Sequence, residues 1–461
     1  MTQRDREVDV VVIGLGPGGE HVAGTLAGTG LVVAGVESRL VGGECPYWGC
    51  VPSKAMIRSA DLVAEARRAP ALAGRAWMDP DWKRVARRVR EVTSDWDDTA
   101  AVQRFTGKGG ILVRGHGRIT APGEVTVTPP AGGVQVIRAR RAIVIGTGTC
   151  PAVPPVPGLA GTPFWTNHEA IETDTLPSSL VVLGGGAVGA ELAQVFARFG
   201  CQVTVAEGAG RLLPPEEPEA SALIAGAFEA DGIVVRTGHQ AAAVSHSARR
   251  GFTVTLDGGE ELAAEALLVA TGRRADLAAV GVGALGIDEH LRALPVDGEL
   301  RAAPGVWAVG DITGKGAFTH VSMYQAGVVI DSILGRGRAA QYHAVPRVTF
   351  TDPEIGAVGM TEAQARGQGL DVRAGMSSRP ASSRGWIHGV GDGEFVKLVA
   401  DAGRGVLVGA TAAGPVGGEV LGALTVAVQA RVPVRELQRT IFAFPTFHRG
   451  IEAALGALDL G

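Results

Sequence analysis

The 461-residue chain is poor in cysteine, in net charge and in long apolar runs, and each absence excludes a class of protein. Four cysteines are too few for a secreted disulfide scaffold of this length. A net charge of −4 predicts no nucleic-acid partner. No run of about 18 apolar residues occurs, so no membrane span is predicted. The polar stretch 1–8 leads directly into a strand, which predicts a cytoplasmic protein without a signal peptide.

Two of the cysteines, Cys45 and Cys50, lie close together just before the stretch 52–54 (Pro-Ser-Lys). Their spacing suits a small disulfide ring at the start of a helix, where exposed N–H groups and the helix dipole lower a thiol's pKa. So small a ring removes little loop entropy, which argues against a purely stabilising bond. Without a neighbouring Cys or His, the pair offers too few ligands for zinc. We therefore predict a redox-active disulfide and no metal, with Cys150 and Cys201 as small core residues.

A dinucleotide fingerprint opens the chain. The apolar run 8–13 predicts a buried strand, and it is followed by Gly14, Gly16 and Gly19 and then by a helical stretch. Glycines at this spacing allow a tight turn, close approach of the backbone to a pyrophosphate, and packing of helix on strand. Glu37 ends the next strand, where its carboxylate can accept a ribose hydroxyl.

The same pattern returns in the middle of the chain. The strand 180–183 precedes Gly184, Gly186 and Gly189, and the strand after the helix ends at Glu207. A carboxylate here binds a ribose diol and repels a 2′-phosphate, so this site is predicted to prefer NADH to NADPH. Arg211 lies a few residues further on, where its positive charge could reduce the preference for NADH.

Shorter signals accompany the two fingerprints. Apolar strands at 142–148 and 267–274 end in Thr-Gly, and the strand 306–311 ends in Gly-Asp, where ligands bind in α/β sheets. Further nucleotide-contacting residues are predicted at Gly43, Thr147, Gly148, Gly272, Gly310 and Asp311. After residue 342 no phosphate loop occurs, so this region is predicted to be an α+β lobe without a nucleotide of its own.

Residues 60–110 read mostly as helix. Their tryptophans, Trp77, Trp82 and Trp96, are predicted to be core residues rather than site residues.

These motifs, in this order, resemble the FAD-dependent pyridine nucleotide–disulfide oxidoreductases, such as lipoamide dehydrogenase, glutathione reductase and mercuric reductase. The resemblance covers nearly the whole chain. It implies an α/β fold with two Rossmann-like domains, one for FAD and one for NAD(P)H, and a C-terminal α+β dimerisation domain that forms a homodimer. The expected limits are 1–150 and 276–341 for the FAD domain, 151–275 for the NAD(P)H domain, and 342–461 for the dimerisation domain.

The resemblance also implies roles for individual residues. Cys50 is expected to be the thiolate facing the flavin and Cys45 the outer thiol that attacks the substrate. Lys54 is expected to lie near flavin N5 and to pair with Glu191. FAD is expected on the first fingerprint together with Glu37 and Asp311.

The C-terminal stretch departs from the family pattern. Most members carry His-Pro-Thr-x-x-Glu, whose His serves as acid–base; here Phe444 stands in place of the His and Arg449 in place of the Glu. Phenylalanine cannot transfer a proton. One interpretation is that His448 and Glu452, four residues apart on one helix face, replace the missing pair. The other is that the substrate is unusual. Soluble transhydrogenases and mercuric reductases carry an aromatic residue here, but the chain ends without the cysteine pair of mercuric reductases, which disfavours mercury.

The sequence therefore predicts an enzyme that passes electrons from NADH through FAD to a Cys45–Cys50 disulfide and on to a small disulfide or another electrophile. Two alternatives remain. One is an NADH:quinone, diaphorase-type or transhydrogenase-like flavin reductase in which the cysteines are not obligatory. The other is a redox-sensing flavoprotein.

Overall fold

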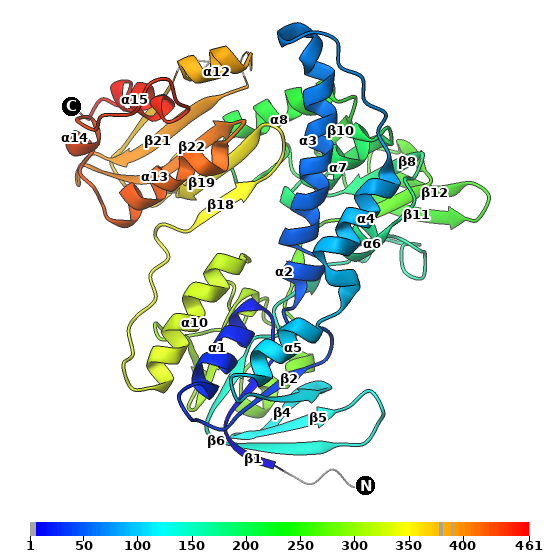
Figure 1. Cartoon of the computed structure of the whole chain (residues 1–461), viewed down its shortest axis with the longest axis vertical. Helices are drawn as coiled ribbons and strands as arrows, with labels where there is room; N and C mark the ends of the chain where they lie inside the picture. Colours follow the sequence, from blue (N-terminus) through cyan, green and yellow to red (C-terminus); the bar gives the residue numbers. More distant parts are fainter. Residues whose placement is uncertain (1–5, 378–380, 390, 392, 461) are drawn as a thin grey trace. The chain divides into compact units, whose positions relative to one another are not determined.

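The computed structural model describes residues 6–377, 381–389, 391 and 393–460. It contains two compact units (Figure 1). The first unit comprises Met1–Pro52, Arg88–Ala152 and Arg273–Gln341; the second comprises Ser53–Arg87, Val153–Gly272 and Tyr342–Gly461. The domain limits given above stay a prediction.

The first unit is built on a sheet of eight strands in the order β16-β17-β6-β1-β2-β3, with the β4–β5 hairpin attached to β6. The pairs β1–β2, β1–β6, β2–β3 and β6–β17 are parallel. The strands are β1 (Arg6–Ile13), β2 (Val33–Glu37), β3 (Ile111–Arg114), β4 (His116–Ala121), β5 (Glu124–Thr128), β6 (Gln135–Ile145), β16 (Arg301–Ala303) and β17 (Val306–Ala308), with the short pair β7 (Cys150–Pro151) and β15 (Arg273–Arg274).

The helices of this unit explain why β1 is apolar on both faces. They are α1 (Pro17–Ala27), α2 (Glu44–Tyr47), α5 (Thr99–Thr106), α9 (Leu277–Val280) and α10 (Thr319–Ile333), with 3₁₀ turns η1 (Ser94–Trp96), η2 (Val282–Leu285) and η3 (Asp311–Thr313). Val10 packs in the cluster under α1, α5 and α10, whereas the adjacent Val11 packs on the opposite side with residues of β4 and β5 (Figure 1). Because neighbouring strand residues point to opposite faces, a sheet covered on both sides needs a continuous apolar run.

The second unit contains a parallel sheet in the order β10-β9-β8-β14. An antiparallel β11-β12-β13 sheet follows β10 in the chain. These elements are α6 (Asn167–Glu172), β8 (Ser179–Leu183), α7 (Ala187–Arg198), β9 (Gln202–Glu207), α8 (Pro218–Ala230), β10 (Val234–Thr237), β11 (Ala241–Ser247), β12 (Gly251–Leu256), β13 (Glu261–Ala264) and β14 (Ala266–Val269). Like the first sheet, this one carries a glycine loop between its first strand and first helix, as the repeated fingerprint predicts.

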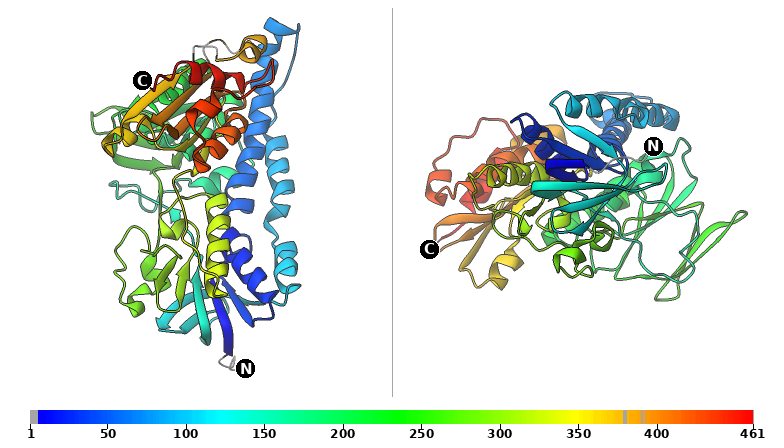
Figure 2. Two further views of the ribbon diagram at one scale, coloured as in Figure 1. Left: turned by 90° about the vertical axis from the view of Figure 1, so that its left-hand side faces the viewer. Right: turned by 90° about the horizontal axis from the view of Figure 1, so that it is seen from below.

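The C-terminal part of the second unit is a five-stranded antiparallel sheet in the order β18-β19-β22-β21-β20. Helices α13 and α15 share one apolar cluster on one face of the sheet (orange to red in Figure 2). Helix α11 packs in a smaller cluster on the other face. The elements are β18 (Pro346–Thr349), β19 (Glu354–Gly359), α11 (Glu362–Gly367), β20 (Val372–Met376), α12 (Ser383–His388), β21 (Phe395–Asp401), β22 (Val406–Gly414), α13 (Gly417–Gln429), α14 (Val434–Leu437) and α15 (Arg449–Gly456). The predicted α+β lobe is confirmed.

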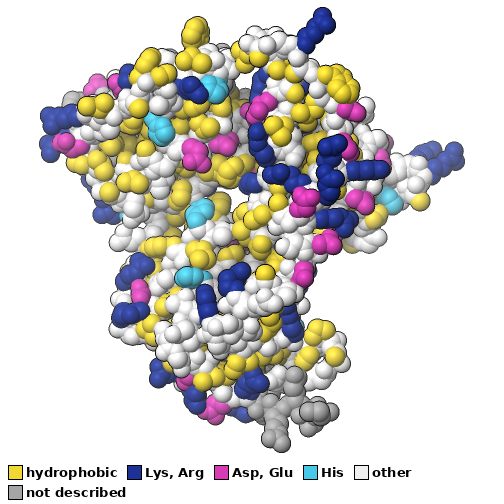
Figure 3. Space-filling model, viewed as in Figure 1, with side chains coloured by type: hydrophobic (Ala, Val, Ile, Leu, Met, Phe, Trp, Pro, Cys, Tyr) yellow, Lys and Arg dark blue, Asp and Glu magenta, His cyan; other side chains and the backbone are white. Residues whose placement is uncertain are grey.

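Two further helices, α3 (Cys50–Leu72) and α4 (Trp82–Val92), run through the stretch predicted to be helical. In α4 the apolar residues before the last turn recur at helical spacing and are buried, whereas Val92 at its end is exposed. Lys and Arg side chains gather over α3 and α4 on the surface (Figure 3). No helix in the described part of the chain is both long and apolar enough to cross a lipid bilayer.

The three tryptophans of this region differ. Trp82 is buried and stacks on Phe196 with ring centroids 4.9 Å apart, and Trp96 is half-buried. Trp77 is 89% exposed, so its assignment to a core was wrong. It lies in the irregular connection between α3 and α4, which presents no helix face that could bury it.

Candidate active site

The first glycine loop joins β1 to α1 and has two positions that exclude a side chain. Gly14 has φ +88°, and a Cβ there would lie 2.6 Å from the Gly146 carbonyl oxygen. A Cβ on Gly19 would lie 2.0 Å from the Gly14 oxygen, so this glycine lets the helix approach the strand. At Gly16 a Cβ would meet nothing within 4 Å, which leaves room beside the loop for a ligand. The N-terminus of α1 begins here and favours an anionic group.

Gly43 connects this loop to the cysteine segment. It has φ +68°, and a Cβ on it would lie 2.7 Å from Gly16 Cα. The backbone two residues before Cys45 therefore lies against the first glycine loop. Any larger residue at Gly43 would separate the two segments.

The strand-end carboxylate of Glu37 is buried beside the same loop. It accepts hydrogen bonds from the backbone N–H groups of Leu15, at 2.7 Å, and Arg39, at 2.8 Å. A carboxylate offers about four lone-pair sites, so Glu37 can accept a ribose hydroxyl as well.

The second glycine loop, between β8 and α7, repeats these features. Gly184 has φ +107° and lies against the Ala270 carbonyl, Gly189 lies against the Gly184 carbonyl, and Gly186 faces open space. Glu207 accepts hydrogen bonds from the N–H groups of Gly185, at 2.6 Å, and Ala209, at 2.7 Å. These donors stand at the same positions, relative to the loop and the carboxylate, as Leu15 and Arg39 in the first unit.

Arg211 does not extend freely beside Glu207. Its guanidinium donates to the Pro214 carbonyl at 2.7 Å and to the Ser221 hydroxyl at 3.3 Å. Both contacts hold the Arg211 guanidinium, so this arginine, which was predicted to lie near Glu207, is already engaged.

A hydrogen-bonded chain follows the carboxyl ends of β6 and β17 in the first unit. Arg273 donates to the Thr149 hydroxyl at 2.9 Å and lies 3.7 Å from Glu44, and Thr149 donates to Asp311 at 3.0 Å. Burial raises the pKa of Asp311, while the Thr149 hydrogen bond and the Arg273 charge oppose that effect. Glu44 is adjacent in sequence to Cys45. The series of polar contacts therefore connects Asp311, the carboxylate predicted to bind the flavin nucleotide, to the cysteine segment.

The remaining predicted nucleotide residues lie at turns. Gly148, Gly272 and Gly310 have positive φ angles of +66°, +123° and +82°, which favour glycine. Thr147 lies exposed after β6. The Gly310 N–H donates to Gln325 at 2.6 Å, which fixes the turn before Asp311.

The two cysteines are in the reduced thiol form in this structure and are in contact with each other. Cys50 is the first residue of α3, and its sulfur lies 3.6 Å from the Thr319 hydroxyl oxygen at the start of α10. The hydrogen bond to Cys50 and burial raise the pKa of Cys45, and Thr319 opposes them. The arrangement favours a neutral Cys45 thiol beside Cys50.

In the second unit, the Lys54 ammonium lies 2.7 Å from Glu191 on α7. The contact implied by the resemblance is therefore present. Lys54 also lies 4.7 Å from the centre of the Phe350 ring, and the second oxygen of Glu191 accepts the Phe350 N–H at 2.8 Å. Glu191 is buried and is thus held from two sides.

The C-terminal residues do not form the arrangement predicted for them. Glu452 pairs with Arg449 at 2.8 Å, and in the described residues no hydrogen bond joins His448 to Glu452. Glu452 therefore does not orient the imidazole here; its carboxylate forms an ion pair with the Arg449 guanidinium instead. Phe444 is 69% exposed and lies under Arg449, 5.6 Å from ring centre to guanidinium carbon. Phe444 and Arg449, the two residues expected to stand in place of the family's His and Glu, therefore lie next to each other.

Four residues close to these sites were missed by the sequence analysis: Thr149, Arg273, Thr319 and Phe350. Arg273 belongs to a quoted strand-end motif, but nothing in the sequence places it beside Glu44. Of the other two cysteines, Cys150 is half-buried with its sulfur 3.5 Å from the Arg274 carbonyl oxygen, and burial raises the pKa of Cys201 to about 12.

Comparison with protein families accounts for nearly the whole chain. Residues 8–326 match the model of the pyridine nucleotide-disulphide oxidoreductases, and residues 345–455 match the dimerisation domain of the same family.

Individual relatives agree with these matches. The chain is 33% identical to a dihydrolipoyl dehydrogenase of Chlorobaculum tepidum, covering 98% of this chain and 97% of the relative. It is also 33% identical to a mercuric reductase of Acidithiobacillus ferrooxidans, covering 98% and 83%. Among solved structures, the HOCl-induced flavoprotein disulfide reductase RclA of Escherichia coli, as its Cu(II) complex, superimposes with a TM-score of 0.86 at 28% identity, covering 98% and 99%. LpdA of Mycobacterium tuberculosis gives a TM-score of 0.86 at 26% identity, covering 98% and 99%.

Proposed function

We propose that this chain, which belongs to the pyridine nucleotide-disulphide oxidoreductases, oxidises NADH and reduces a small disulfide or another electrophile through Cys45 and Cys50. One observation carries the proposal. The Cys50 thiol at the start of α3 is in contact with the Cys45 thiol in α2, and the backbone at Gly43, two residues before Cys45, lies against Gly16 of the first glycine loop.

The residues present fit both nucleotides. Gly14, Gly16, Gly19, Glu37 and Asp311 would hold FAD, and Gly184, Gly186, Gly189 and Glu207 would hold NADH. When bound, FAD supplies two-electron transfer between NADH and the cysteine pair. The open positions at Gly16 and Gly186 and the spare lone pairs of both glutamates support this assignment.

The cysteines themselves perform thiol–disulfide exchange. In the reduced pair, Cys45 loses its proton and attacks one sulfur of the acceptor disulfide, which releases one thiol and leaves a mixed disulfide on Cys45. Cys50 then attacks the Cys45 sulfur, releases the second thiol and closes the Cys45–Cys50 bond. The acceptor gains two electrons and two protons, and the cysteine pair loses them.

The proton on Cys45 makes a base necessary, because its pKa lies above the ordinary value. We propose His448 as this base, because Phe444 stands where the family's catalytic His is expected. His448→Ala is expected to depress turnover with disulfides and to spare reduction of the flavin by NADH. Equal turnover in both proteins would return His448 to the role of a polar surface residue.

The C-terminal sheet matches the family's dimerisation domain, and we propose a homodimer on that basis. Mixed dimers made from a Cys45 variant and a His448 variant would recover activity if each site draws on both subunits. A fully active monomer would contradict this.

The central test is anaerobic titration with NADH, followed by visible absorbance. A long-wavelength thiolate-to-flavin band that is lost in Cys50→Ser is the expected result. Bleaching of the flavin without this band would show that the cysteines are bystanders.

A second function, an NADH:quinone reductase of the diaphorase type, is favoured by one observation: the raised pKa of Cys45, which makes this thiol a slow nucleophile at neutral pH. It predicts that Cys45→Ser leaves turnover with quinones intact. Loss of all turnover in Cys45→Ser would exclude it.

A further inference from the structure

Helix α7 carries a buried polar face that binds the chain segment leading into the C-terminal sheet. Glu191, Gln194 and Arg198 lie on one side of the helix, since they are three, four and seven residues apart. Glu191 accepts the Phe350 N–H; Gln194 accepts the Asp352 N–H at 2.7 Å and donates to the Asp352 carbonyl at 2.9 Å. Arg198 completes the set with an ion pair to the Asp352 carboxylate at 2.8 Å.

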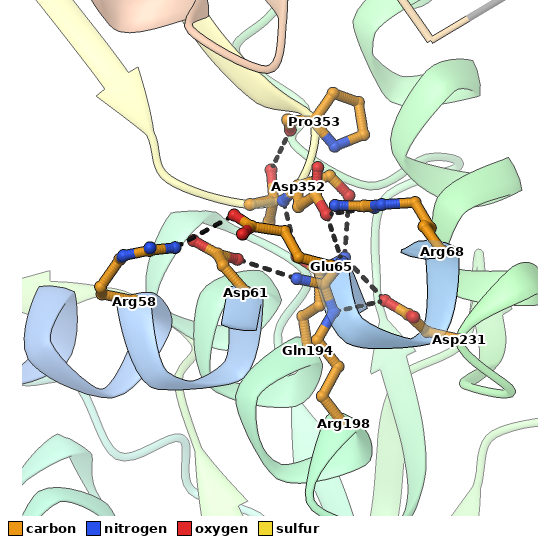
Figure 4. Close-up of polar contacts among 10 residues, drawn as sticks. Arg58, Asp61, Glu65, Arg68, Gln194, Arg198, Asp231, Asp352 and Pro353 are labelled. Carbon is orange, nitrogen blue, oxygen red and sulfur yellow. Dashed lines mark hydrogen bonds and ion pairs between the residues drawn. The ribbon is translucent and has the colours of Figure 1, made fainter. Parts of the chain in front are cut away.

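The same face of α7 binds α3 with charges in alternating order. Lys54 and Asp61 are seven residues apart on α3, as Glu191 and Arg198 are on α7. Lys54 pairs with Glu191. Asp61 pairs with Arg198 at 2.8 Å (Figure 4). One further heptad along α3, Arg68 reaches Asp352 at 2.8 Å.

Arg198 is the centre of this network. Its side chain is only 3% exposed and contacts three carboxylates, those of Asp61, Asp231 and Asp352 (Figure 4). Burial raises the pKa of Asp352, but the charges of Arg198 and Arg68 outweigh it and hold that pKa below its usual value. The planar guanidinium can serve several carboxylates in fixed directions, which a lysine ammonium cannot do equally well.

We propose that Arg198 is a positioning residue for electron transfer from NADH. Arg198 links Asp61 of α3 and Asp352 to α7, and it thereby fixes the positions of the Lys54 and Glu191 side chains. The inference rests on the proposed function, which puts this pair beside the reacting cofactors.

The route from Arg198 to Lys54 is short and consists of contacts already given. Asp352 is two residues after Phe350, whose N–H holds one oxygen of Glu191 and whose ring lies against Lys54. Loosening Asp352 therefore frees Phe350, and with it both partners of the ion pair. The effect of Arg198 on the pair is indirect, because Arg198 contacts neither Lys54 nor Glu191 in the described network.

A double-mutant cycle tests the proposal. Anaerobic stopped-flow measures the rate of flavin reduction by NADH in Glu191→Gln, Arg198→Met and the double variant. We expect each single variant to be about tenfold slower than the parent, and the double variant to stay within about twofold of Glu191→Gln, because both changes act on one ion pair. Asp61→Asn, which removes one carboxylate and keeps its volume, provides the milder variant should Arg198→Met not fold. It is expected to slow the reaction less, again without adding to Glu191→Gln.

A second readout does not depend on turnover. Hydrogen–deuterium exchange of the purified protein should show faster exchange of the Phe350 and Asp352 amides in Arg198→Met, by about tenfold or more. Leu424→Ala is the matched control, since it removes a buried side chain of α13 in the same unit and costs about 2–5 kcal/mol. Neither the local exchange nor the rate of flavin reduction should change in this control.

The outcomes separate the inference from the function on which it rests. A slow Glu191→Gln with a normal Arg198→Met overturns the positioning role alone. The positioning role is also overturned if the rate losses of the two single variants multiply in the double variant. It is likewise overturned if Leu424→Ala slows flavin reduction as much as Arg198→Met does. An unaltered Glu191→Gln refutes the proposed role of the ion pair, and the inference with it.

Discussion

The hydroxyl oxygen of Thr319 lies 3.6 Å from the sulfur of Cys50, so the first residue of α10 contacts the first residue of α3. The same hydroxyl opposes the two largest effects that raise the pKa of Cys45, its hydrogen bond to Cys50 and its burial.

Replacing Thr319 is therefore predicted to make the reduced dithiol less reactive. Thr319→Val removes the hydroxyl, raises the Cys45 pKa further and should slow alkylation of the reduced pair by iodoacetamide by about tenfold at pH 8. Thr319→Ser keeps the hydroxyl and should react like the parent. Alkylation followed by mass spectrometry from pH 6 to 10 gives both profiles, and coinciding profiles for Val and the parent would contradict the prediction.

The nucleotide preference is predicted to depend on the charge of Glu207. Glu207→Gln keeps an acceptor oxygen for the Gly185 N–H but removes the charge that repels a 2′-phosphate. The ratio of kcat/KM for NADH over NADPH should be at least several-fold in favour of NADH in the parent and should fall by about tenfold in the variant. Equal use of both nucleotides by the parent protein would refute the assignment.

A buried lysine in the second unit is predicted to be essential for stability. Lys397 is 7% exposed and its ammonium lies 2.8 Å from Glu219, 3.0 Å from Glu362 and 3.1 Å from Glu217. Lys397→Met leaves these carboxylates without their cation and should lower the free energy of unfolding by about 3–5 kcal/mol, measured in urea. Arg58→Met, which breaks an exposed pair with Glu65, is the control and should cost less than about 1 kcal/mol. Similar losses in both variants would show that burial does not matter here.

Stability is also predicted to depend on pH through Glu354. Burial raises the pKa of Glu354 to about 7, although the Gly418 N–H, at 2.9 Å, opposes this. The folded state then binds the proton more tightly than the unfolded state. The contribution of Glu354 is greatest below about pH 4.5 and is lost as the pH rises to about 7.

Glu354→Gln should remove this part of the pH dependence while retaining an acceptor for Gly418. The difference in Tm between the variant and the parent should therefore grow, in favour of the variant, from pH 4.5 to pH 7.5. A constant difference over this range would contradict the assigned pKa. Asp61, whose pKa burial raises to about 6, also titrates in this pH range in both proteins.

The nucleotide loops could be predicted from the sequence because their constraints are local. Gly14 and Gly184 have backbone angles that favour glycine, and Glu37 and Glu207 follow their loops at the end of the next strand. A local pattern of strand, turn and carboxylate therefore carries most of the information about these sites.

The contacts between distant segments could not be predicted in this way. Thr319 is 269 residues from Cys50, and nothing in its neighbourhood distinguishes it from other helix-initial threonines. The spacing of Lys54 and Asp61 matches that of Glu191 and Arg198, but the sequence does not say which two helices meet. For His448, helical spacing alone indicated Glu452 as its partner. In the structure the Glu452 carboxylate forms an ion pair with Arg449 instead.

The backbone N–H groups that hold Glu37 and Glu207 have one further consequence. Each carboxylate is fixed on folding by a donor from its glycine loop, so its rotamer freedom is lost before any nucleotide arrives. If Glu37 and Glu207 bind the ribose hydroxyls as proposed, binding requires no ordering of these side chains, and the affinity is not reduced by that entropy. Each nucleotide would meet a carboxylate that its own glycine loop already holds in place.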